Sequence, residues 1–354
     1  MVKKKKTNSR REFTSTLTTN TPSSKIWKTI KRINGKPVSP NMPIGDHNTT
    51  KKEKANLLLE HFNRHCTDEF VREHENELYV KNNITIPLEH ISLVELKSCL
   101  TKIKNTSPGD DQICNVFLKK APDNILMDIL YLFNTSLTSG SLPTGWKKGT
   151  ICAIPKPMKD PSLITSHRPI TMLSCVGKLM ERIVKRRIEF HLEQNHVFTA
   201  CQSGFRRCRG TTDILSILKH VIHQSREKKE FCIVTYLDLE GAYDCVWHKG
   251  LIKKLNAVGL DETLINWLGD YLTNRKIQVR VGTAMSDQKH LVRGLPQGAV
   301  LSPTLFNVML HDLPTSDTVK VLSYADDITL VTRAKKLKML NYKCNNIWIN
   351  YIHG

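Results

Sequence analysis

The chain has 354 residues, of which 40% are hydrophobic and 24% are charged, with a formal net charge of +20. This composition supports a sizeable core, so it excludes wholesale disorder, and the length suggests about two domains or lobes. No apolar run approaches the roughly 18 residues of a membrane span, and the ten scattered cysteines include no C-x-x-C pair. We therefore expect a protein of the nucleus and/or cytoplasm, with reduced thiols and no membrane partner.

The first sixth of the chain holds half of the net positive charge. Residues 1–24 are basic, rich in Ser, Thr and Asn, and poor in large apolar residues, which predicts a flexible arm. A phosphate-binding or nuclear-targeting tail and a merely solvated segment both fit this composition. We assign residues 25–110 to an N-terminal helical extension or linker, and residues 111–354 to the main domain.

Two elements are expected in the first half of this domain. The apolar run from Thr150 to Ile154 predicts a strand. Residues 174–193 predict a helix, because apolar residues recur along one side at a period of about 3.6 residues. The basic residues of the opposite side are Lys178, Arg182, Lys185, Arg186 and Arg187. We interpret this basic side as a solvated surface in preference to a nucleic-acid contact.

Carboxylates stand at the ends of the strands expected in the second half. Residues 231–237 form a short apolar, β-branched run, which predicts a buried central strand ending at Asp238. Two further strand-like runs within residues 319–333 flank Asp326 and Asp327. They predict a β-hairpin with these two carboxylates at its tip.

A glycine-rich loop lies between those strands. Residues 276–281 alternate between apolar and polar types, as in a half-buried strand, and Gly294 and Gly298 bound the loop that follows. Ser302 and Pro303 then predict the N-cap and first turn of a helix.

The three aspartates at these strand ends predict a metal site. Adjacent carboxylates repel one another, so ionising them beside an apolar sheet is costly unless a cation neutralises them. Hard oxygen ligands suit Mg²⁺, and two such ions about 4 Å apart can activate a hydroxyl and stabilise a leaving pyrophosphate. An Asp-Asp pair in a hairpin is also favourable turn chemistry, so the pair alone does not decide between these interpretations.

Five motifs, in the order of the family, resemble those of reverse transcriptases. They are Ile154-Pro155-Lys156-Pro157 with His167-Arg168-Pro169-Ile170, Gln202-Ser203-Gly204-Phe205-Arg206, residues 237–248 (LDLEGAYDCVWH), residues 293–303 (RGLPQGAVLSP), and Tyr324-Ala325-Asp326-Asp327. In these motifs the chain resembles most the enzymes of non-LTR (LINE-type) retrotransposons, particularly jockey-like ones. The resemblance extends loosely from about residue 22 to the end.

The resemblance implies roles for the residues nearest the carboxylates. Asp238, Asp326 and Asp327 would be the catalytic metal ligands, helped by the Leu239 carbonyl, and would hold two Mg²⁺ ions, or Mn²⁺ in their place. Tyr243 would exclude the 2′-hydroxyl that distinguishes a ribonucleotide. Its ring is expected beside the aspartates and facing open space.

The resemblance also implies binding roles for residues on other segments. Lys156 and Arg168 would hold the triphosphate of the incoming dNTP, with Lys159 as an alternative to Lys156. Gln297 would contact the nucleotide and the template base. The remaining template and primer contacts would come from Gly294, Pro296, Gly298 and Tyr324.

The implied fold is α+β, with the fingers and palm of a right-hand polymerase. Only 27 residues follow Asp327, so the palm is expected to be incomplete and the thumb largely missing. The implied activity is that of a mobile-element RNA-directed DNA polymerase, a nucleotidyltransferase that moves a nucleotide from a dNTP to a primer 3′-hydroxyl. Its partners would be an RNA template, a DNA primer and dNTPs.

Two alternatives are weighed against this function. A truncated, non-catalytic nucleic-acid-binding relic of such an element would keep the same aspartates, so the sequence leaves it open. A viral RNA-dependent RNA polymerase is less favoured, because Tyr243 stands where a ribonucleotide enzyme needs space.

Overall fold

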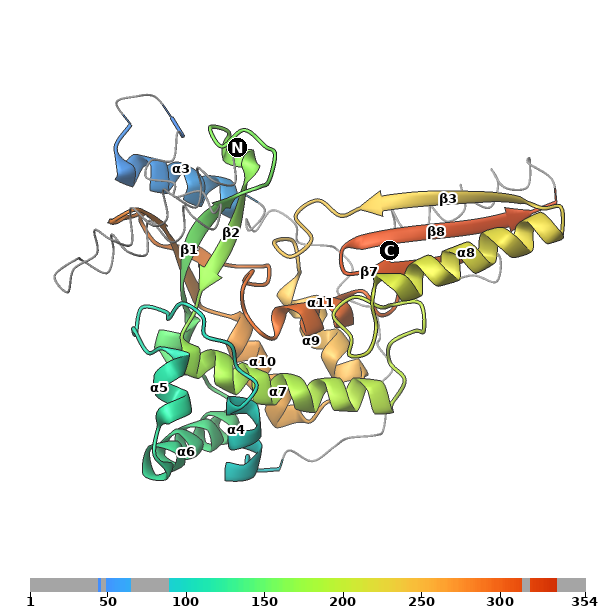
Figure 1. The fold of residues 1–354 in the computed structure, drawn as a ribbon. Coiled ribbons are helices and arrows are strands. Elements are labelled where there is room, and N and C mark those ends of the chain that lie inside the picture. Colours follow the sequence, from blue (N-terminus) through green and yellow to red (C-terminus); the bar gives the residue numbers. More distant parts are fainter. Residues whose placement is uncertain (1–43, 46–48, 65–88, 314–318, 336–354) are drawn as a thin grey trace, which may run out of the picture.

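The structure is a computed structural model in which two β-sheets flank a helical body (Figure 1). It describes residues 44–45, 49–64, 89–313 and 319–335. The predicted basic arm, residues 1–24, lies outside the described residues, as does most of the segment on which the prediction of a missing thumb rests. No helix among the described residues is long and apolar enough to cross a bilayer.

Helices account for more of the described chain than strands do. The α-helices are α3 (Lys51–Asn63), α4 (Leu93–Leu100), α5 (Asn115–Lys120), α6 (Asp123–Ser139), α7 (Cys175–Gln194), α8 (Thr211–Glu227), α9 (His248–Ala257), α10 (Glu262–Leu272) and α11 (Ser302–Met309). The strands are β1 (Lys148–Pro155), β2 (His167–Met172), β3 (Phe231–Asp238), β4 (Arg275–Val281), β5 (Ala284–Met285), β6 (Lys289–Leu291), β7 (Val319–Tyr324) and β8 (Asp327–Ala334).

The larger sheet has the strand order β2-β1-β4-β5, with β6 also paired to β4. Strands β1 and β4 are parallel, and the other pairs are antiparallel. Helix α3 lies on this sheet, where Leu58, Leu59 and Phe62 pack against Ile151 and Val279. The described part of the predicted extension thus shares a core with the main domain, and the division at residue 110 stays a prediction.

Helix α7 runs through the centre of the helical body, as its periodicity predicts. It begins after Ser174, whose hydroxyl accepts a hydrogen bond from the Gly177 N–H (3.2 Å), and its apolar stripe is buried. Glu181, on the same helix, is also buried. Its carboxylate accepts hydrogen bonds from the N–H groups of Val300 (2.6 Å) and Leu301 (3.1 Å). The helix therefore holds the segment that leads into α11.

The smaller sheet is antiparallel, with the order β3-β8-β7, and α8 covers one face of it (Figure 1). The predicted hairpin is confirmed as β7 and β8. The prediction that residues 231–237 form the buried central strand is wrong for the described residues. Strand β8 pairs on both sides and is buried, whereas β3 lies at the edge and is half-exposed.

Helix α11 begins one residue earlier than its sequence suggests. Leu301 occupies the N-cap position, and Ser302 is the first helical residue. The Ser302 hydroxyl donates to the Pro296 carbonyl (2.9 Å) instead of capping the helix. The predicted N-cap is therefore wrong by one position, because the preceding loop offers this serine a buried acceptor.

Candidate catalytic site

Two of the three predicted aspartates lie side by side on neighbouring strands of the smaller sheet. Asp238 at the end of β3 pairs directly with Asp327 at the start of β8. Residues opposed in this way have Cα atoms about 4.5–5.5 Å apart and side chains on the same face. Both aspartates are exposed to solvent, and Asp326, in the adjoining turn, is half-buried. The sheet register thus brings together residues that are far apart in the sequence.

The turn that carries Asp326 is tight. Tyr324 pairs with Asp327, so only Ala325 and Asp326 lie between the strands. Ala325 has φ of +58°, the left-handed conformation that two-residue hairpin turns require and that disfavours residues other than glycine. The surroundings must therefore hold this turn in place.

The Gln202–Arg206 motif supplies that support. Its backbone forms a short bridge with β7, in which the Ser203 N–H donates to the Ser323 carbonyl (2.9 Å) and the Ser323 N–H donates to the Cys201 carbonyl (3.0 Å). Gly204 then lies so close to the turn that a Cβ on it would overlap the backbone nitrogen of Ala325. The glycine is needed for this close approach.

Tyr243 lies beside the turn, packed between aromatic rings. Its ring stacks on Phe306 (centroids 4.9 Å apart, 13° between planes) and meets Phe205 edge-on (6.5 Å). Burial raises the pKa of its phenol well above the usual range, and the negative charge of Asp326 adds to that shift. The charge of Asp326 thus acts on the Tyr243 phenol, and one face of the ring packs on Phe306 in place of the open space that was expected.

The glycine-rich loop is bonded to the segment that follows β3. The N–H groups of Gly294 and Leu295 donate to the carbonyls of Val246 (2.8 Å) and Tyr243 (2.7 Å). His248, through Nε2, hydrogen-bonds the Gly294 carbonyl (2.7 Å). Gly294 has φ of +89°, and a Cβ there would lie 2.7 Å from the Asp244 carbonyl oxygen. The loop therefore follows the Tyr243 segment closely.

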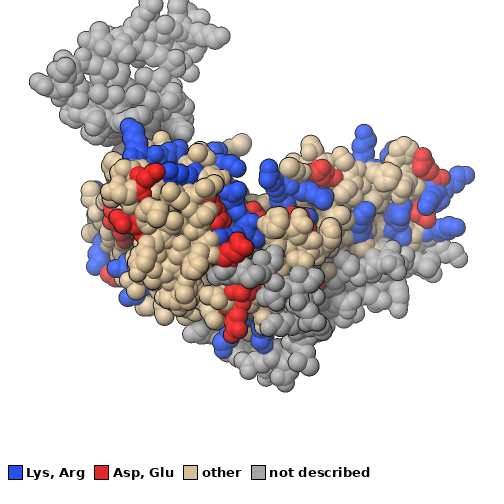
Figure 2. Space-filling view, turned by 90° about the horizontal axis from the view of Figure 1, so that it is seen from below, with Lys and Arg blue, Asp and Glu red and all other residues tan. Residues whose placement is uncertain are grey.

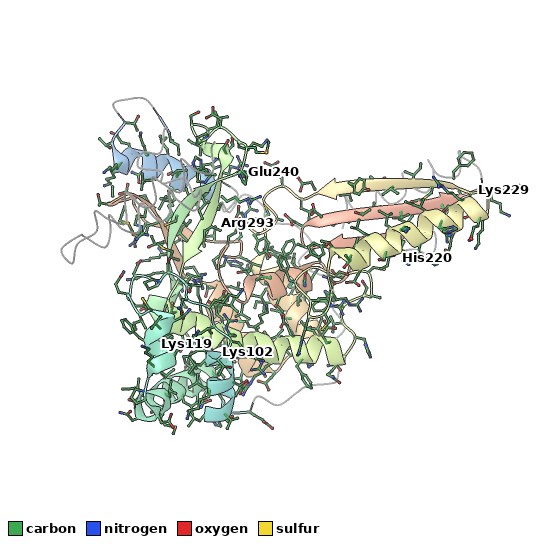
Figure 3. The ribbon with its side chains drawn as sticks, viewed as in Figure 1. Lys102, Lys119, His220, Lys229, Glu240 and Arg293 are labelled. Atoms are coloured by element: carbon green, nitrogen blue, oxygen red, sulfur yellow. The ribbon has the colours of Figure 1, made fainter. Side chains whose placement is uncertain are left out.

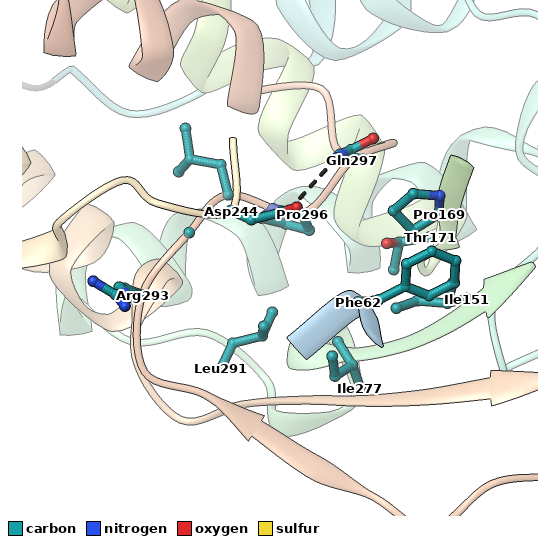
Figure 4. A pocket seen from close by; sticks show the side chains of 12 residues that line it. Phe62, Ile151, Pro169, Thr171, Asp244, Ile277, Leu291, Arg293, Pro296 and Gln297 are labelled. Atoms are coloured by element: carbon teal, nitrogen blue, oxygen red, sulfur yellow. Dashed lines mark hydrogen bonds between the residues drawn. The ribbon is translucent and has the colours of Figure 1, made fainter. Parts of the chain in front are cut away.

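The other side of the loop reaches the larger sheet. The Thr171 N–H on β2 donates to the Gln297 carbonyl (2.7 Å), and the Gln297 amide donates to Asp244 over 3.5 Å. Figure 4 shows that second bond at the edge of a pocket that residues of α3, β1, β2 and β4 also line. Gly298, with φ of +120°, also lies against Thr171. The loop thus links β2 of the larger sheet to the segment that follows β3.

Comparison with known proteins identifies the family. Residues 154–347, more than half of the chain, match the family described as "Reverse transcriptase (RNA-dependent DNA polymerase)". The chain belongs to the reverse transcriptase family. The matched range includes both strands that carry the aspartates, the Gln202–Arg206 motif and the glycine-rich loop.

Similar proteins come from insect mobile elements. The chain is 30% identical over 330 residues to the "RNA-directed DNA polymerase from mobile element jockey" of Drosophila melanogaster, covering 88% of this chain and 36% of that protein. It is 30% identical over 325 residues to the "Probable RNA-directed DNA polymerase from transposon BS" of the same species, covering 86% and 36%. A type-1 element R2 polyprotein of Popillia japonica is 29% identical over 259 residues, covering 68% and 34%. The chain thus spans about a third of the length of these relatives.

The three aspartates of this chain fit a divalent cation in their donor chemistry. They offer hard carboxylate oxygens, which Mg²⁺ prefers, and no ion pair within the described residues neutralises them. No three His, Cys, Asp or Glu side chains among the described residues cluster tightly enough to enclose an ion. The structure thus brings Asp238 and Asp327 together, while Asp326, beside Tyr243, does not complete a closed ligand set with them.

The two residues expected to bind triphosphate belong to the other sheet. Lys156 follows β1, and its ammonium donates to the Thr165 carbonyl (2.9 Å) in the β1–β2 connection. Arg168 is exposed on β2, where it pairs with Ile154. Neither makes a recorded contact with the aspartates. Their role in binding a triphosphate stays a prediction.

Several residues that shape the site were not assigned a role from the sequence. The turn is supported by Gly204, Tyr243 is held by Phe205 and Phe306, and the loop is held by Asp244 and Glu181. Gly204 and Phe205 belong to a motif that the sequence singles out. Their function was not readable, because the contacts cross between segments far apart in the chain.

Proposed function

We propose that this chain carries the RNA-directed DNA polymerase centre of a mobile element. It would transfer a nucleotide from a dNTP to the 3′-hydroxyl of a DNA primer paired with an RNA template. The observation that carries the proposal is the register that sets Asp238 opposite Asp327, with Asp326 in the adjoining turn. The family match and the printed names of the jockey and BS relatives support the same activity.

The three aspartates would hold the metal, with the Leu239 carbonyl as a further ligand. Reverse transcriptases depend on divalent metal, and we propose two Mg²⁺ ions, which Mn²⁺ could replace. Bound there, such ions would activate the primer hydroxyl and stabilise the leaving pyrophosphate. The exposure of Asp238 and Asp327 leaves these carboxylates accessible to the phosphates of a substrate.

Other residues would position the substrates. The Tyr243 ring, fixed by its stack on Phe306, would block a ribose 2′-hydroxyl next to Asp326. Gln297 would reach the nucleotide and the template base, on a loop formed with Gly294, Pro296 and Gly298. Tyr324, at the end of β7, would contact the primer.

The two sheets would correspond to the two parts of a right-hand polymerase. The larger sheet with α3 would belong to the fingers. There Lys156 would bind the triphosphate as a point charge, and Arg168 would bind it through two parallel hydrogen bonds from its guanidinium. The smaller sheet with α8 would be the palm. The glycine-rich loop, bonded to β2 and to the segment that follows β3, would keep the two parts in register.

Primer extension on a homopolymeric RNA template with Mg²⁺ and one labelled dNTP tests the proposal. The chain should extend the primer, and Asp327→Asn should abolish extension. Asp128→Asn is the matched control, because Asp128 is an exposed aspartate on α6, away from the strands of the site. Absence of extension by the unaltered chain, together with retained binding of the RNA–DNA hybrid, would favour the non-catalytic relic instead.

A further inference from the structure

A groove of about 750 Å³ lies along α7, bounded also by α4, residues 198–207 and α11. We call it the α7 groove. The basic side of α7, interpreted from the sequence as a solvated surface, supplies one wall through Arg182 and Arg186, and Arg207 lines the groove from the 198–207 segment. On the face seen from below, Lys and Arg side chains also gather on both sides of the notch between the helical body and the part of the molecule that carries the smaller sheet (Figure 2).

The α7 groove carries positive charge that its own carboxylates do not neutralise. Each of its three carboxylates already has a basic partner: Glu95 with Arg187 (2.7 Å), Glu193 with Arg206 (2.6 Å) and Glu189 with Lys185 (3.4 Å). Four more basic side chains line the groove and have no acidic partner among the described residues. We call these the groove cations: Lys102, Arg182, Arg186 and Arg207. Their charges favour a polyanion with several phosphates.

One groove cation also has an unmet hydrogen-bonding requirement. The Nε of Arg182 is buried, with no acceptor within reach among the described residues. Buried donors are nearly always paired, because an unpaired donor has lost its hydrogen bonds to water without replacing them. Its neighbour Arg186 donates to the Ser98 hydroxyl (3.1 Å), which orients the guanidinium without neutralising it. Arg182 and Arg186 thus both keep a positive charge on the wall of the groove.

Exposed aromatic rings accompany these charges. Phe190 is 62% exposed and Phe205 is 44% exposed, although both are large apolar side chains. Aromatic rings beside basic side chains are the means by which proteins bind unpaired nucleic-acid bases, because every base can stack on a ring whatever its identity. A duplex, whose bases stack on one another, would leave these rings unused. The combination therefore favours a single strand.

We propose that the α7 groove binds an unpaired stretch of RNA, with its phosphates on the groove cations and its bases on Phe190 and Phe205. That the polyanion is RNA rests on the proposed function. Phe205 joins the groove to the catalytic site, because it meets Tyr243 edge-on at 6.5 Å. The groove thus extends the nucleic-acid-binding surface beyond the aspartates.

Binding of a fluorescent, unstructured RNA, measured by anisotropy in EDTA over a range of salt concentrations, tests the proposal. Lys102→Gln/Arg207→Gln removes two exposed groove cations, and Arg226→Gln/Lys229→Gln removes equal charge from the end of α8. Lys102 and Lys229 are far apart (Figure 3). Because each phosphate contact of a single strand contributes about −0.7 to the slope of log K against log salt, the groove variant should lose about 1.4 of that slope and bind roughly tenfold or more weakly. The control variant should bind like the unaltered chain.

The stacking component needs its own pair of variants. Phe190→Leu removes the ring but keeps an apolar side chain, and Phe117→Leu, on α5, makes the same change at a ring that is 64% exposed outside the groove. Phe190→Leu should weaken RNA binding by about fivefold, near the lower end of the stacking contribution of one base. Phe117→Leu should leave RNA binding unchanged.

The outcomes separate this proposal from the catalytic one. The assay contains no metal, so Asp327→Asn should bind RNA like the unaltered chain whether or not the chain is a polymerase. Equal effects of the groove and control variants would overturn the α7 groove and leave the catalytic proposal standing. Double-stranded RNA that binds as tightly, and loses as much in the groove variant, would overturn the single-strand assignment.

Discussion

Asp238 on β3 lies directly opposite Asp327 on β8, at the same end of an antiparallel sheet. Like charges opposed in this way destabilise a sheet unless something compensates them. The pairing therefore makes a prediction about stability as well as about catalysis. Mg²⁺ or Mn²⁺ should raise the melting temperature of the chain, because an ion that binds only the folded state stabilises it by mass action.

Neutralising one aspartate of the pair should remove both the repulsion between the two side chains and the stabilisation by metal. Asp327→Asn should stabilise the metal-free chain slightly and abolish the metal-dependent rise in melting temperature. Loss of a direct ligand should also lower primer extension by more than the roughly 10–100-fold that outer-shell changes cost. Asp128→Asn should leave both measurements as they are. A metal-dependent rise that persists in Asp327→Asn would place the ion elsewhere.

The contact between Gly204 and the Ala325 turn predicts that no side chain larger than that of glycine is tolerated at residue 204. Gly204→Ala should displace the turn, because its Cβ would overlap the Ala325 backbone, and the Asn307 amide that donates to the Gly204 carbonyl (2.7 Å) prevents easy movement. Overpacking of this kind costs about 1–3 kcal/mol. We expect a lower melting temperature and a large loss of primer extension.

Gly269→Ala is the matched control for this change. A Cβ at Gly269, on α10, would meet no atom within 4 Å, and alanine favours a helix over glycine by about 1 kcal/mol. Its melting temperature should therefore stay the same or rise. If Gly204→Ala behaved like Gly269→Ala, the turn would not depend on this close contact.

Local patterns explain which elements could be predicted. The β7–β8 hairpin and α7 were predicted correctly, because each follows from a period or a turn within a short window of sequence. The position of β3 was not, since apolar runs in central and edge strands look alike before their partners are known. The direct pairing of Asp238 with Asp327 was not predicted, because strand register at long range leaves no local signal.

The features that could not be predicted depend on contacts between segments that are far apart in the sequence. The basic side of α7 looks like a solvated surface in the sequence, yet the 198–207 segment folds back beside it and turns it into one wall of a groove. The approach of Gly204 to Ala325 is hidden for the same reason. In both cases the residues could be picked out in the sequence. Their role depends on the distant segment that packs against them, which the sequence does not reveal.

His248 predicts a pH dependence of stability. Burial lowers the pKa of its imidazole, and the charge of Arg275 lowers it further, while the hydrogen bond to the Gly294 carbonyl acts in the opposite direction. A base with a lowered pKa in the folded state contributes stability above its unfolded pKa of about 6.5, and loses that contribution as the pH falls. The melting temperature should therefore fall between pH 7.5 and pH 5.5.

His248→Gln should isolate this contribution, because glutamine can still donate to the Gly294 carbonyl but does not titrate. We expect its melting temperature to fall less over the same pH range, by about 2–4 °C for each kcal/mol that His248 contributes. The measurement is a pair of thermal melts at each pH. Parallel curves for the two proteins would show that other groups control the pH dependence.

The packing of Tyr243 predicts how this residue would select sugars. Since its ring is fixed on Phe306 and lies near Asp326, the ring itself, more than the hydroxyl, should exclude a ribose 2′-hydroxyl. Tyr243→Phe keeps the ring and should keep the preference for deoxynucleotides. Tyr243→Ala opens the space, and should reduce that preference by about tenfold, equivalent to about 1.4 kcal/mol of differential binding. The measurement is the ratio of kcat/KM for matched deoxynucleotides and ribonucleotides, and a ratio unchanged in Tyr243→Ala would leave Tyr243 with a packing role alone.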